Sequence, residues 1–176
     1  KQYTEVLRIN PGYAPAHVNL GLELAKTGRF DEAEQHFRRA LKIEPTIQKA
    51  HTNLGKILLE KDMAREAITE LQEEVNNNPE YAEAYYNMGI AYSRIGMLQN
   101  AIDSFSQALS LEPSNTRARE YLKALQGRKI KIDNAITRVE NGLRRNPRDI
   151  ELLNKLAVLN AGKGEYENAL KALERI

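Results

Sequence analysis

The chain has 176 residues, of which 41% are hydrophobic and only 6% aromatic, and its net charge at pH 7 is +2. So small a net charge gives no reason to expect a polyanionic partner such as nucleic acid. Cysteine is absent, which excludes disulfides and thiolate metal sites. No apolar run approaches the ~18 residues of a membrane span, and no signal peptide is visible. The sequence favours the cytoplasm without fixing the compartment.

A 34-residue period runs through the chain. Five prolines stand at this spacing: Pro11, Pro45, Pro79, Pro113 and Pro147. The frame of residues 14–45 returns at 48–79, at 82–113 and, in weaker form, at 116–147. A constant period of this length indicates a helical repeat array. In such an array each unit contacts only its neighbours, so no central core is required.

Each unit predicts two antiparallel helices. Residues 1–13 match the second half of a preceding repeat, units follow at 14–47, 48–81 and 82–115, a degenerate unit covers 116–149, and a truncated unit covers 150–176. In the 82–115 unit, small and apolar residues recur at helical spacing, namely Ala84, Met88, Ala91 and Tyr92, then Ala101, Phe105, Ala108 and Leu109. Because helices of ~13 residues are marginal alone, neighbouring units must bury one another's faces.

The turn inside a unit is predicted at residues that tolerate positive φ. Gly28, Gly96 and Gly164 hold this place in their units, and Asp62 holds it in the 48–81 unit. Glycine readily takes the left-handed conformation that ends a helix, and Asp tolerates it better than most residues. The second helix should end before the proline, whose predecessor is pushed away from helical dihedrals.

The 48–81 unit has Glu74 where its neighbours have Ala40 and Ala108. A carboxylate buried without a partner is costly. We therefore expect Glu74 to turn towards the edge of its helix.

The 116–149 unit departs furthest from the pattern. Lys123 replaces the small glycine, Gln126 replaces a large residue, and Ile130 falls at the turn position. A β-branched residue in the left-handed region would be an outlier. We expect the first helix to end near Gly127, with a long connection to about Ile132 and a change of superhelical twist. The alternative is that the repeat column simply drifts here.

The residues in the repeat frame carry a family resemblance. The aligned columns are Leu20, Leu54, Met88, Leu122 and Leu156; Gly21, Gly55, Gly89, Lys123 and Ala157; Ala33, Ala67, Ala101, Ala135 and Ala169; Phe37, Leu71, Phe105, Val139 and Leu173; and Ala40, Glu74, Ala108 and Gly142. This pattern closely resembles the tetratricopeptide repeat. The resemblance implies an all-α fold, a right-handed α-solenoid of antiparallel helix pairs. Repeats of 35 residues that bind RNA are similar, but the invariant period of 34 argues against them.

No catalytic or cofactor site is predicted. His17 and His51 occupy the same column of adjacent units, so their rings could approach, but two histidines without a third ligand make a poor metal site. His36 is expected at the surface. Paired carboxylates, a nucleophile elbow and a glycine-rich phosphate loop are all missing from the sequence. We therefore expect no enzymatic activity, no cofactor and no metal in this chain.

Positive residues gather at two places, Arg128, Lys129 and Lys131 in the irregular unit and Arg144, Arg145 and Arg148 near the end of a helix. Cations at helix C-termini are favoured by the helix dipole and need no ligand. Aromatic stacking partners are not interleaved with them, as single-stranded nucleic acid would require. A solvated surface is the favoured interpretation, and no nucleic acid partner is predicted.

The first helix of each unit lines the concave face of such an array, and one of its columns holds Asn19, Asn53 and Asn87. A side-chain amide can grip the main chain of an extended peptide. This column resembles the asparagine ladder of the O-linked N-acetylglucosamine transferases. The other residues predicted to bind a peptide are Lys49, Lys56, Tyr86, Arg94 and Arg117. The alternative is that these side chains are merely solvated.

The predicted function is a protein-interaction scaffold that binds a peptide or protein segment in the concave groove. One alternative is a substrate-recruiting arm of a larger, glycosyltransferase-like enzyme, and another is a structural module that self-associates end to end. Leu170 and Leu173 at one end and Tyr3, Val6 and Leu7 at the other suggest such contacts. The two-carboxylate clamp by which some relatives hold chaperone C-termini is absent, since at best two of its five places match.

Overall fold

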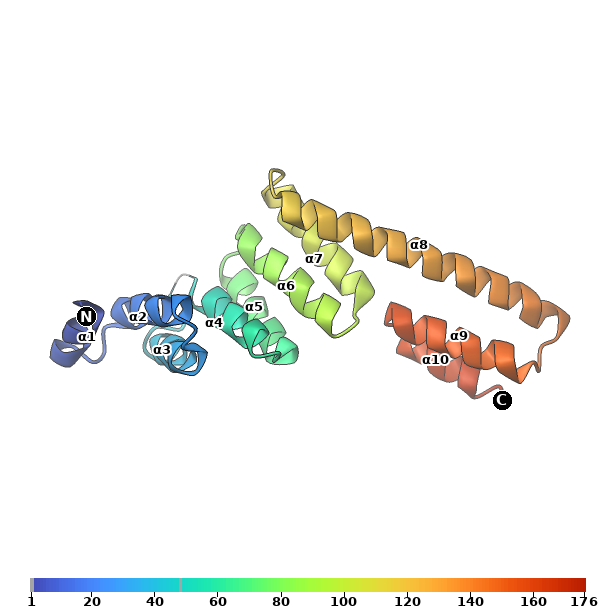
Figure 1. The fold of residues 1–176 in the computed structure, drawn as a ribbon, viewed down its shortest axis with the longest axis horizontal. Coiled ribbons are helices and arrows are strands. Elements are labelled where there is room, and N and C mark those ends of the chain that lie inside the picture. Colours follow the sequence, from blue (N-terminus) through green and yellow to red (C-terminus); the bar gives the residue numbers. More distant parts are fainter. Residues whose placement is uncertain (1, 48) are drawn as a thin grey trace.

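The computed structural model describes residues 2–47 and 49–176, and these form α-helices without any strand. In chain order the helices are α1 (Gln2–Ile9), α2 (Ala14–Lys26), α3 (Phe30–Ile43), α4 (Ala50–Glu60), α5 (Ala64–Asn77), α6 (Ala82–Arg94), α7 (Leu98–Leu111), α8 (Thr116–Arg145), α9 (Ile150–Lys163) and α10 (Tyr166–Leu173). They follow one another along an elongated molecule with the two termini at opposite ends (Figure 1). The prediction of an all-α solenoid is confirmed.

Three regular helix pairs, α2–α3, α4–α5 and α6–α7, make up the N-terminal two thirds of the array. Within each pair a glycine of the first helix faces a large side chain of the second. A methyl group added at Gly21, Gly55 or Gly89 would lie 2.9, 2.7 or 2.8 Å from the nearest atom of Phe37, Leu71 or Phe105. The glycine column therefore sets the close approach of the two helices, and a larger residue there would force them apart.

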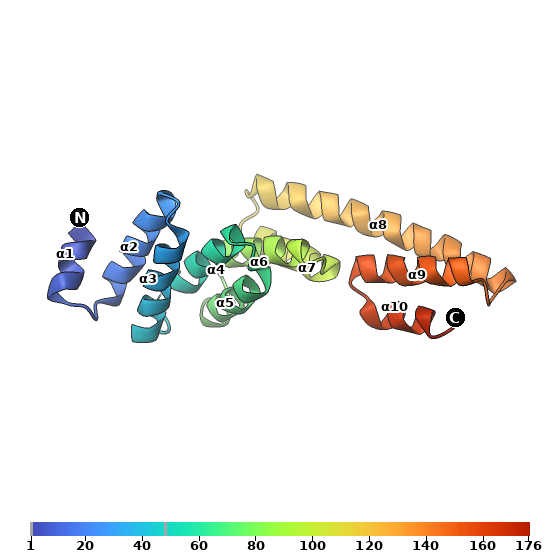
Figure 2. The ribbon, with the colours of Figure 1, turned by 60° about the horizontal axis from the view of Figure 1, so that its bottom comes forward.

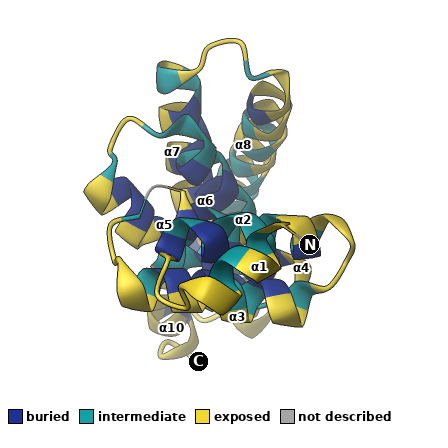
Figure 3. Cartoon of the chain, turned by 90° about the vertical axis from the view of Figure 1, so that its left-hand side faces the viewer, coloured by how far each residue is buried: buried dark blue, intermediate teal, exposed yellow. Residues whose placement is uncertain are grey.

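The turns within these pairs follow the sequence prediction. Gly28, Asp62, Gly96 and Gly164 have φ values of 75°, 60°, 76° and 88°, which lie in the left-handed region. Leu24 and Leu58 accept backbone hydrogen bonds from Arg29 and Met63, just past the turns, and so close the ends of α2 and α4. Burial follows the same plan, because buried stretches of neighbouring helices face each other and the loops are exposed (Figure 3).

The turn predicted within the 116–149 unit is wrong. Helix α8 runs without interruption through its 30 residues, so no helix ends at Gly127 and no loop connects it to Ile132. A hairpin here would bring Lys123, in the glycine column, against the second helix, as Gly89 is brought against Phe105. It would also need a left-handed residue where Ile130 stands. Continuing the helix avoids both costs.

Because α8 does not fold back, its two halves pack against different helices. The first half packs against α7, and the second half packs against α9, which forms the last antiparallel pair with α10. Figures 1 and 2 show α8 as a long rod along the C-terminal half of the molecule, beside α7 at one end and α9 at the other, while α1–α5 lie beyond its N-terminal end. One apolar cluster is centred on α2–α6, and a separate one is formed by the second half of α8 with α9 and α10.

The loop of the last pair reaches back to the regular pairs. At Gly164, in the α9–α10 turn, an added methyl group would lie 3.7 Å from the carbonyl oxygen of Gly96 in the α6–α7 turn. Nearby, the Lys129 Nζ atom donates a hydrogen bond of 2.6 Å to Gln99 Oε1 on α7. The α9–α10 turn therefore lies close to the α6–α7 turn, and the hydrogen bond of Lys129 joins α8 to α7 beside it.

Candidate functional site

The candidate site is the surface formed by the first helices of the units. Helices α2, α4 and α6 contact one another in succession, and aromatic rings connect α6 to the start of α8. Tyr86 on α6 lies 6.3 Å from Tyr121 on α8, measured between ring centroids, and Tyr121 stacks on Phe105 at 5.1 Å. Residues of the same repeat column on these four helices can therefore face one ligand.

The three asparagines are not equivalent. Asn19 and Asn53 are half-buried, and neither side chain hydrogen-bonds within the described part of the chain. Asn87 is only 6% exposed, and its Nδ2 atom donates a hydrogen bond of 2.8 Å to the carbonyl oxygen of Glu83 on the same helix. Asn19 also lines a shallow hollow with Pro15, Val18, Glu44, Thr46 and Ile47. Two of the three amides therefore remain open to a ligand.

Lys56 is occupied by a contact between units. Its Nζ atom donates to Glu83 Oε1 at 2.8 Å, and the Tyr81 hydroxyl donates to Glu83 Oε2 at 2.6 Å. Burial alone would raise the pKa of the Glu83 carboxyl, but these hydrogen bonds outweigh it and hold that pKa below its ordinary value. Lys49 Nζ lies 5.8 Å from the centroid of the Tyr81 ring, a cation–π distance. The ion pair ties α4 to α6 and neutralises the middle of the groove.

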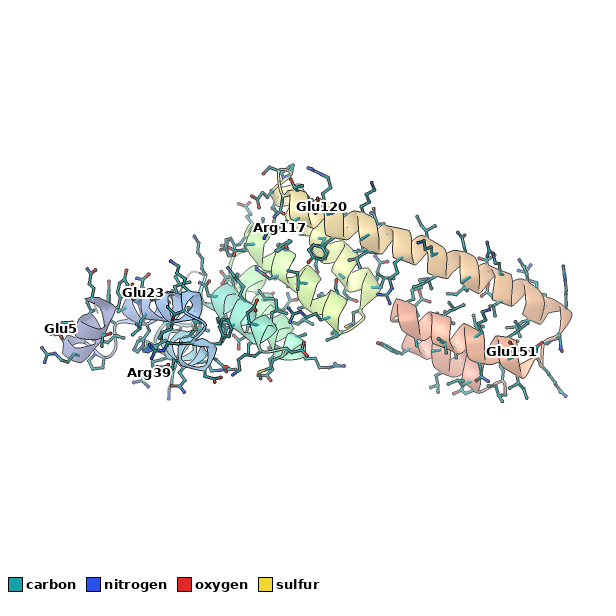
Figure 4. The ribbon with its side chains drawn as sticks, viewed as in Figure 1. Glu5, Glu23, Arg39, Arg117, Glu120 and Glu151 are labelled. Atoms are coloured by element: carbon teal, nitrogen blue, oxygen red, sulfur yellow. The ribbon has the colours of Figure 1, made fainter. Side chains whose placement is uncertain are left out.

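Arg94 and Arg117 have different surroundings. Arg94 donates to the carbonyl oxygen of Leu59, and its Nη1 atom lies 3.7 Å from a carboxylate oxygen of Asp62, so it holds the end of α4. Arg117 is exposed at the start of α8 and forms no ion pair with any described carboxylate. It lies beside Glu120 in Figure 4. Of the two, Arg117 is the one whose charge is available to a ligand.

Glu74 is a structural residue that the sequence prediction misplaced. It is only 3% exposed, and its two carboxylate oxygens accept hydrogen bonds from the backbone N–H groups of Lys49 and Thr52, at 3.3 and 3.2 Å. It does not turn to the helix edge. Instead it satisfies the otherwise unpaired amides at the start of α4, where Lys49 has a φ of 66°. The sign of this role in the sequence is that Glu74 is a charged residue where the neighbouring units have alanine.

His17 and His51 each bond to a side chain of their own unit, and not to each other. His17 Nδ1 lies 2.9 Å from His36 Nδ1, and His51 Nδ1 lies 2.8 Å from Glu70 Oε2. His36 is half-buried, not on the open surface as predicted. Burial and the charge of His17 lower the pKa of His36. Burial also opposes the charged form of His51, but its hydrogen bond to Glu70 outweighs this and raises the pKa of His51.

No group of three or more metal-ligating side chains comes together in the described residues. Over the same residues, no helix combines the length and the apolar character needed to cross a membrane. What the geometry offers is a surface of open amides, an unpaired guanidinium and aromatic rings on successive helices. Such a surface is suited to binding, because amides and guanidinium groups recognise peptide carbonyls and carboxylates.

A chain built mainly from stacked helix pairs that repeat every 34 residues, with its polar column on the first helices, is a helical-repeat solenoid. Family models described as tetratricopeptide repeat match residues 14–47, 82–115 and 125–176. These matches cover more than half of the chain, and the chain belongs to the tetratricopeptide repeat family. The last match begins within α8 and includes its second half together with α9 and α10.

Solved structures of similar fold agree with this assignment. YrrB, described as a tetratricopeptide repeat protein with an unusual peptide-binding site, is 19% identical, with a TM-score of 0.69 over 99% of this chain and 90% of YrrB. The first such domain of Spaghetti (RPAP3), bound to the HSP90 peptide SRMEEVD, is 23% identical, with a TM-score of 0.65 over 66% of this chain and 93% of that domain. A MamA structure is 26% identical, with a TM-score of 0.63 over 92% of this chain and 88% of MamA. No curated protein matches the chain in sequence.

Proposed function

We propose that this chain is a scaffold that binds a peptide or protein segment along the groove formed by α2, α4, α6 and the first half of α8. The observation that carries the proposal is the set of groups left open on these helices. The amides of Asn19 and Asn53 and the guanidinium of Arg117 have no side-chain hydrogen bond or ion pair within the described chain. Polar groups on one column of successive helices are suited to main-chain and carboxylate groups of an extended segment.

Two of the similar structures support a binding role. YrrB is described as having a peptide-binding site, and the Spaghetti domain was solved with a bound peptide. The recruiting arm of a glycosyltransferase-like enzyme remains the alternative, but nothing specific favours it. The continuous ladder of open amides that suggested it is interrupted at Asn87, which is buried and bonded to its own helix.

The proposal is tested with peptides selected from a random twelve-residue display library against the intact chain. The affinity of the tightest peptide is then measured for the wild type and for the double variant Asn19→Ala and Asn53→Ala. Each lost neutral hydrogen bond is worth about 0.5–1.5 kcal/mol, so affinity should fall roughly five- to a hundredfold. Gln107→Ala, on the exposed side of α7, is the control and should change it less than twofold. A peptide that binds the double variant as tightly as the wild type contradicts the groove proposal.

A further inference from the structure

Positive charge is concentrated on α8. Its 30 residues contain nine Lys and Arg against three Asp and Glu, a net charge of +6, whereas the whole chain carries +2 and the other residues together carry −4. A low overall charge therefore hides a strongly basic helix. The field of such a helix attracts anionic groups of a partner and speeds its association.

The positive charges of α8 have no partner of opposite charge inside the described chain, and Arg119 donates only to the carbonyl oxygen of Pro113. Eight of the nine are exposed, and none of the nine forms an ion pair within residues 2–47 and 49–176. The exception to their exposure, Lys129, donates to the neutral Gln99 side chain. Elsewhere in the described chain cations do form ion pairs, for example Lys61, just past α4, with Asp31 at 2.7 Å and Lys163 on α9 with Asp133 at 2.9 Å. The charge of α8 is therefore not compensated by the fold.

Five of these cations, Arg117, Lys123, Arg128, Lys131 and Arg138, define a basic face of α8. Arg117, Arg128, Lys131 and Arg138 are 11, 3 and 7 residues apart, close to whole turns of 3.6 residues, so they share one side of the helix. The 34-residue period relates Arg117, Ala124 and Arg128 to Glu83, Ile90 and Arg94 of the groove. The face thus continues the groove lining and, because α8 does not turn back, extends it beyond the solenoid.

The middle of this face is hollowed where its side chains are small. Ala124 and Gly127 form the floor, with Glu120, Lys123, Arg128 and Lys131 around them. A methyl group added at Gly127 would meet nothing within 4 Å. A bound main chain can therefore approach the helix closely while the surrounding cations reach its carboxylates. Glu120 supplies an acceptor for a backbone N–H group.

We propose that the basic face of α8 docks an acidic protein segment in extended conformation. From Arg117 to Arg138 the helix rises about 32 Å, at ~1.5 Å per residue, which matches about ten residues of extended chain. A protein segment is favoured over nucleic acid because the aromatic rings near the start of this face, Tyr121 and Tyr86, pack against Phe105 and against each other. It is favoured over a lipid surface because the face presents charged and small residues without a row of large apolar ones to insert. The face overlaps the proposed groove on the first half of α8, where the two share Arg117, and continues past it; the test keeps the two apart through Asn19 and Asn53, which belong to the groove alone.

The experiment measures binding of a fluorescein-labelled peptide of ten glutamates at low salt by fluorescence anisotropy. The test variant is Arg128→Glu with Lys131→Glu. Its control is Arg39→Glu with Lys42→Glu on α3, which reverses the same charges at the same spacing on residues that are also exposed and not in ion pairs among those described. Arg39 lies on another part of the molecule (Figure 4). The test variant should lose about tenfold or more in affinity, and the control less than about twofold.

Circular dichroism checks that both variants keep their helix content. A further variant, Arg128→Gln with Lys131→Gln, only removes the charges, and its affinity for the peptide should fall about threefold. Equal losses in the test and control variants would overturn the proposal, because net charge alone would then explain binding. So would an unchanged affinity of the test variant. Anionic phosphatidylserine vesicles and a single-stranded twenty-nucleotide DNA form two further arms. If either binds in a manner that depends on Arg128 and Lys131 while the glutamate peptide does not, the acidic-segment assignment is wrong. Peptide binding that persists in Asn19→Ala with Asn53→Ala separates this face from the groove.

Discussion

The regular pairs α2–α7 and the C-terminal part α8–α10 follow the same 34-residue period but differ in how consecutive helices meet. In the regular pairs, Gly21, Gly55 and Gly89 let the two helices of a unit come together. In α8 the equivalent residue is Lys123, and the two halves of the unit stay in line. The regular pairs keep both a small residue in this column and a left-handed turn residue, whereas α8 has lost both, at Lys123 and Ile130, although length, prolines and apolar spacing are kept.

The largest effect should come from filling that column in a regular pair. Gly89→Leu places a side chain where Phe105 already lies, with 2.8 Å available to a methyl group. We expect a loss of about 3 kcal/mol of stability, which lowers the melting temperature by about 6–12 °C. Lys123 stands in the same column of α8 and is exposed, so Lys123→Leu should shift the melting temperature by less than about 2 °C. Thermal denaturation followed by circular dichroism measures both, and equal shifts would refute the role assigned to the column.

The next largest effect is expected inside the regular pair α4–α5, where Glu74 of α5 accepts hydrogen bonds from the start of α4. Glu74→Ala leaves the amides of Lys49 and Thr52 without their acceptor at the start of α4. Hydrogen bonds to a charged group are worth about 1.5–3 kcal/mol, so we expect a loss of about 2 kcal/mol in urea denaturation. The exposed neighbour serves as control, and Glu73→Ala should change the stability by less than 0.5 kcal/mol. A tolerated Glu74→Ala would mean that the amides find other partners.

Replacing Gly96 or Gly127 by alanine should change the free energy of unfolding by a smaller amount, and the two changes should have opposite signs. Gly96 has a φ of 76°, whereas Gly127 lies inside α8 with nothing within 4 Å of an added methyl group. Gly96→Ala should therefore destabilise by about 1 kcal/mol, because alanine is strained in the left-handed region. Gly127→Ala should stabilise by about 0.5–1 kcal/mol through higher helix propensity. Destabilisation by Gly127→Ala would indicate a turn at this position, as the sequence had suggested.

The smallest expected effect is the pH dependence of stability that comes from the histidine contacts, which lie in the regular pairs. The pKa of His51 is raised, so its contribution to stability is present below about pH 6.5 and lost as pH rises through its folded pKa. The pKa of His36 is lowered, so its contribution is present above about pH 6.5 and lost as pH falls. NMR titration of the imidazole protons should give a higher pKa for His51 than for His36. Removing Glu70 by Glu70→Gln should lower the pKa of His51 and reduce that difference.

The sequence predicted most of the fold because its period fixed the helix pairs and its glycines fixed the turns. Gly28, Asp62, Gly96 and Gly164 act as expected, since their conformation depends on local sterics. It failed at α8 for a physical reason. Ile130 at the turn position predicts a turn of a different kind, but the unit has lost both the turn residue and the small residue at position Lys123, so a hairpin brings no gain and the helix continues.

The candidate site was less predictable, because a repeat column gives the position of a side chain but not its partners. Lys56 and Arg94 stand in the expected column, yet they bind Glu83 and the Leu59 carbonyl between units. Asn87 is buried by its surroundings while Asn53, one repeat earlier, is not. Peptide binding by Asn19, Asn53, Lys49, Tyr86 and Arg117 stays a prediction, as do the end-to-end contacts of Leu170 and Leu173, which are 57% and 46% exposed.

The separate apolar clusters joined by α8 bear on how the molecule unfolds. Only Ala118, Val139 and Leu143 of α8 are buried, so the stretch between Ala118 and Val139 contributes no fully buried side chain to either cluster. Cooperative units in proteins follow contiguous buried contacts. The molecule should therefore open in two steps, with amides of α9 and α10 exchanging hydrogen sooner than those of α4 and α6, and the middle of α8 as the boundary. A covalently continuous helix would then be a thermodynamic joint, across which one half can lose its structure while the other keeps it.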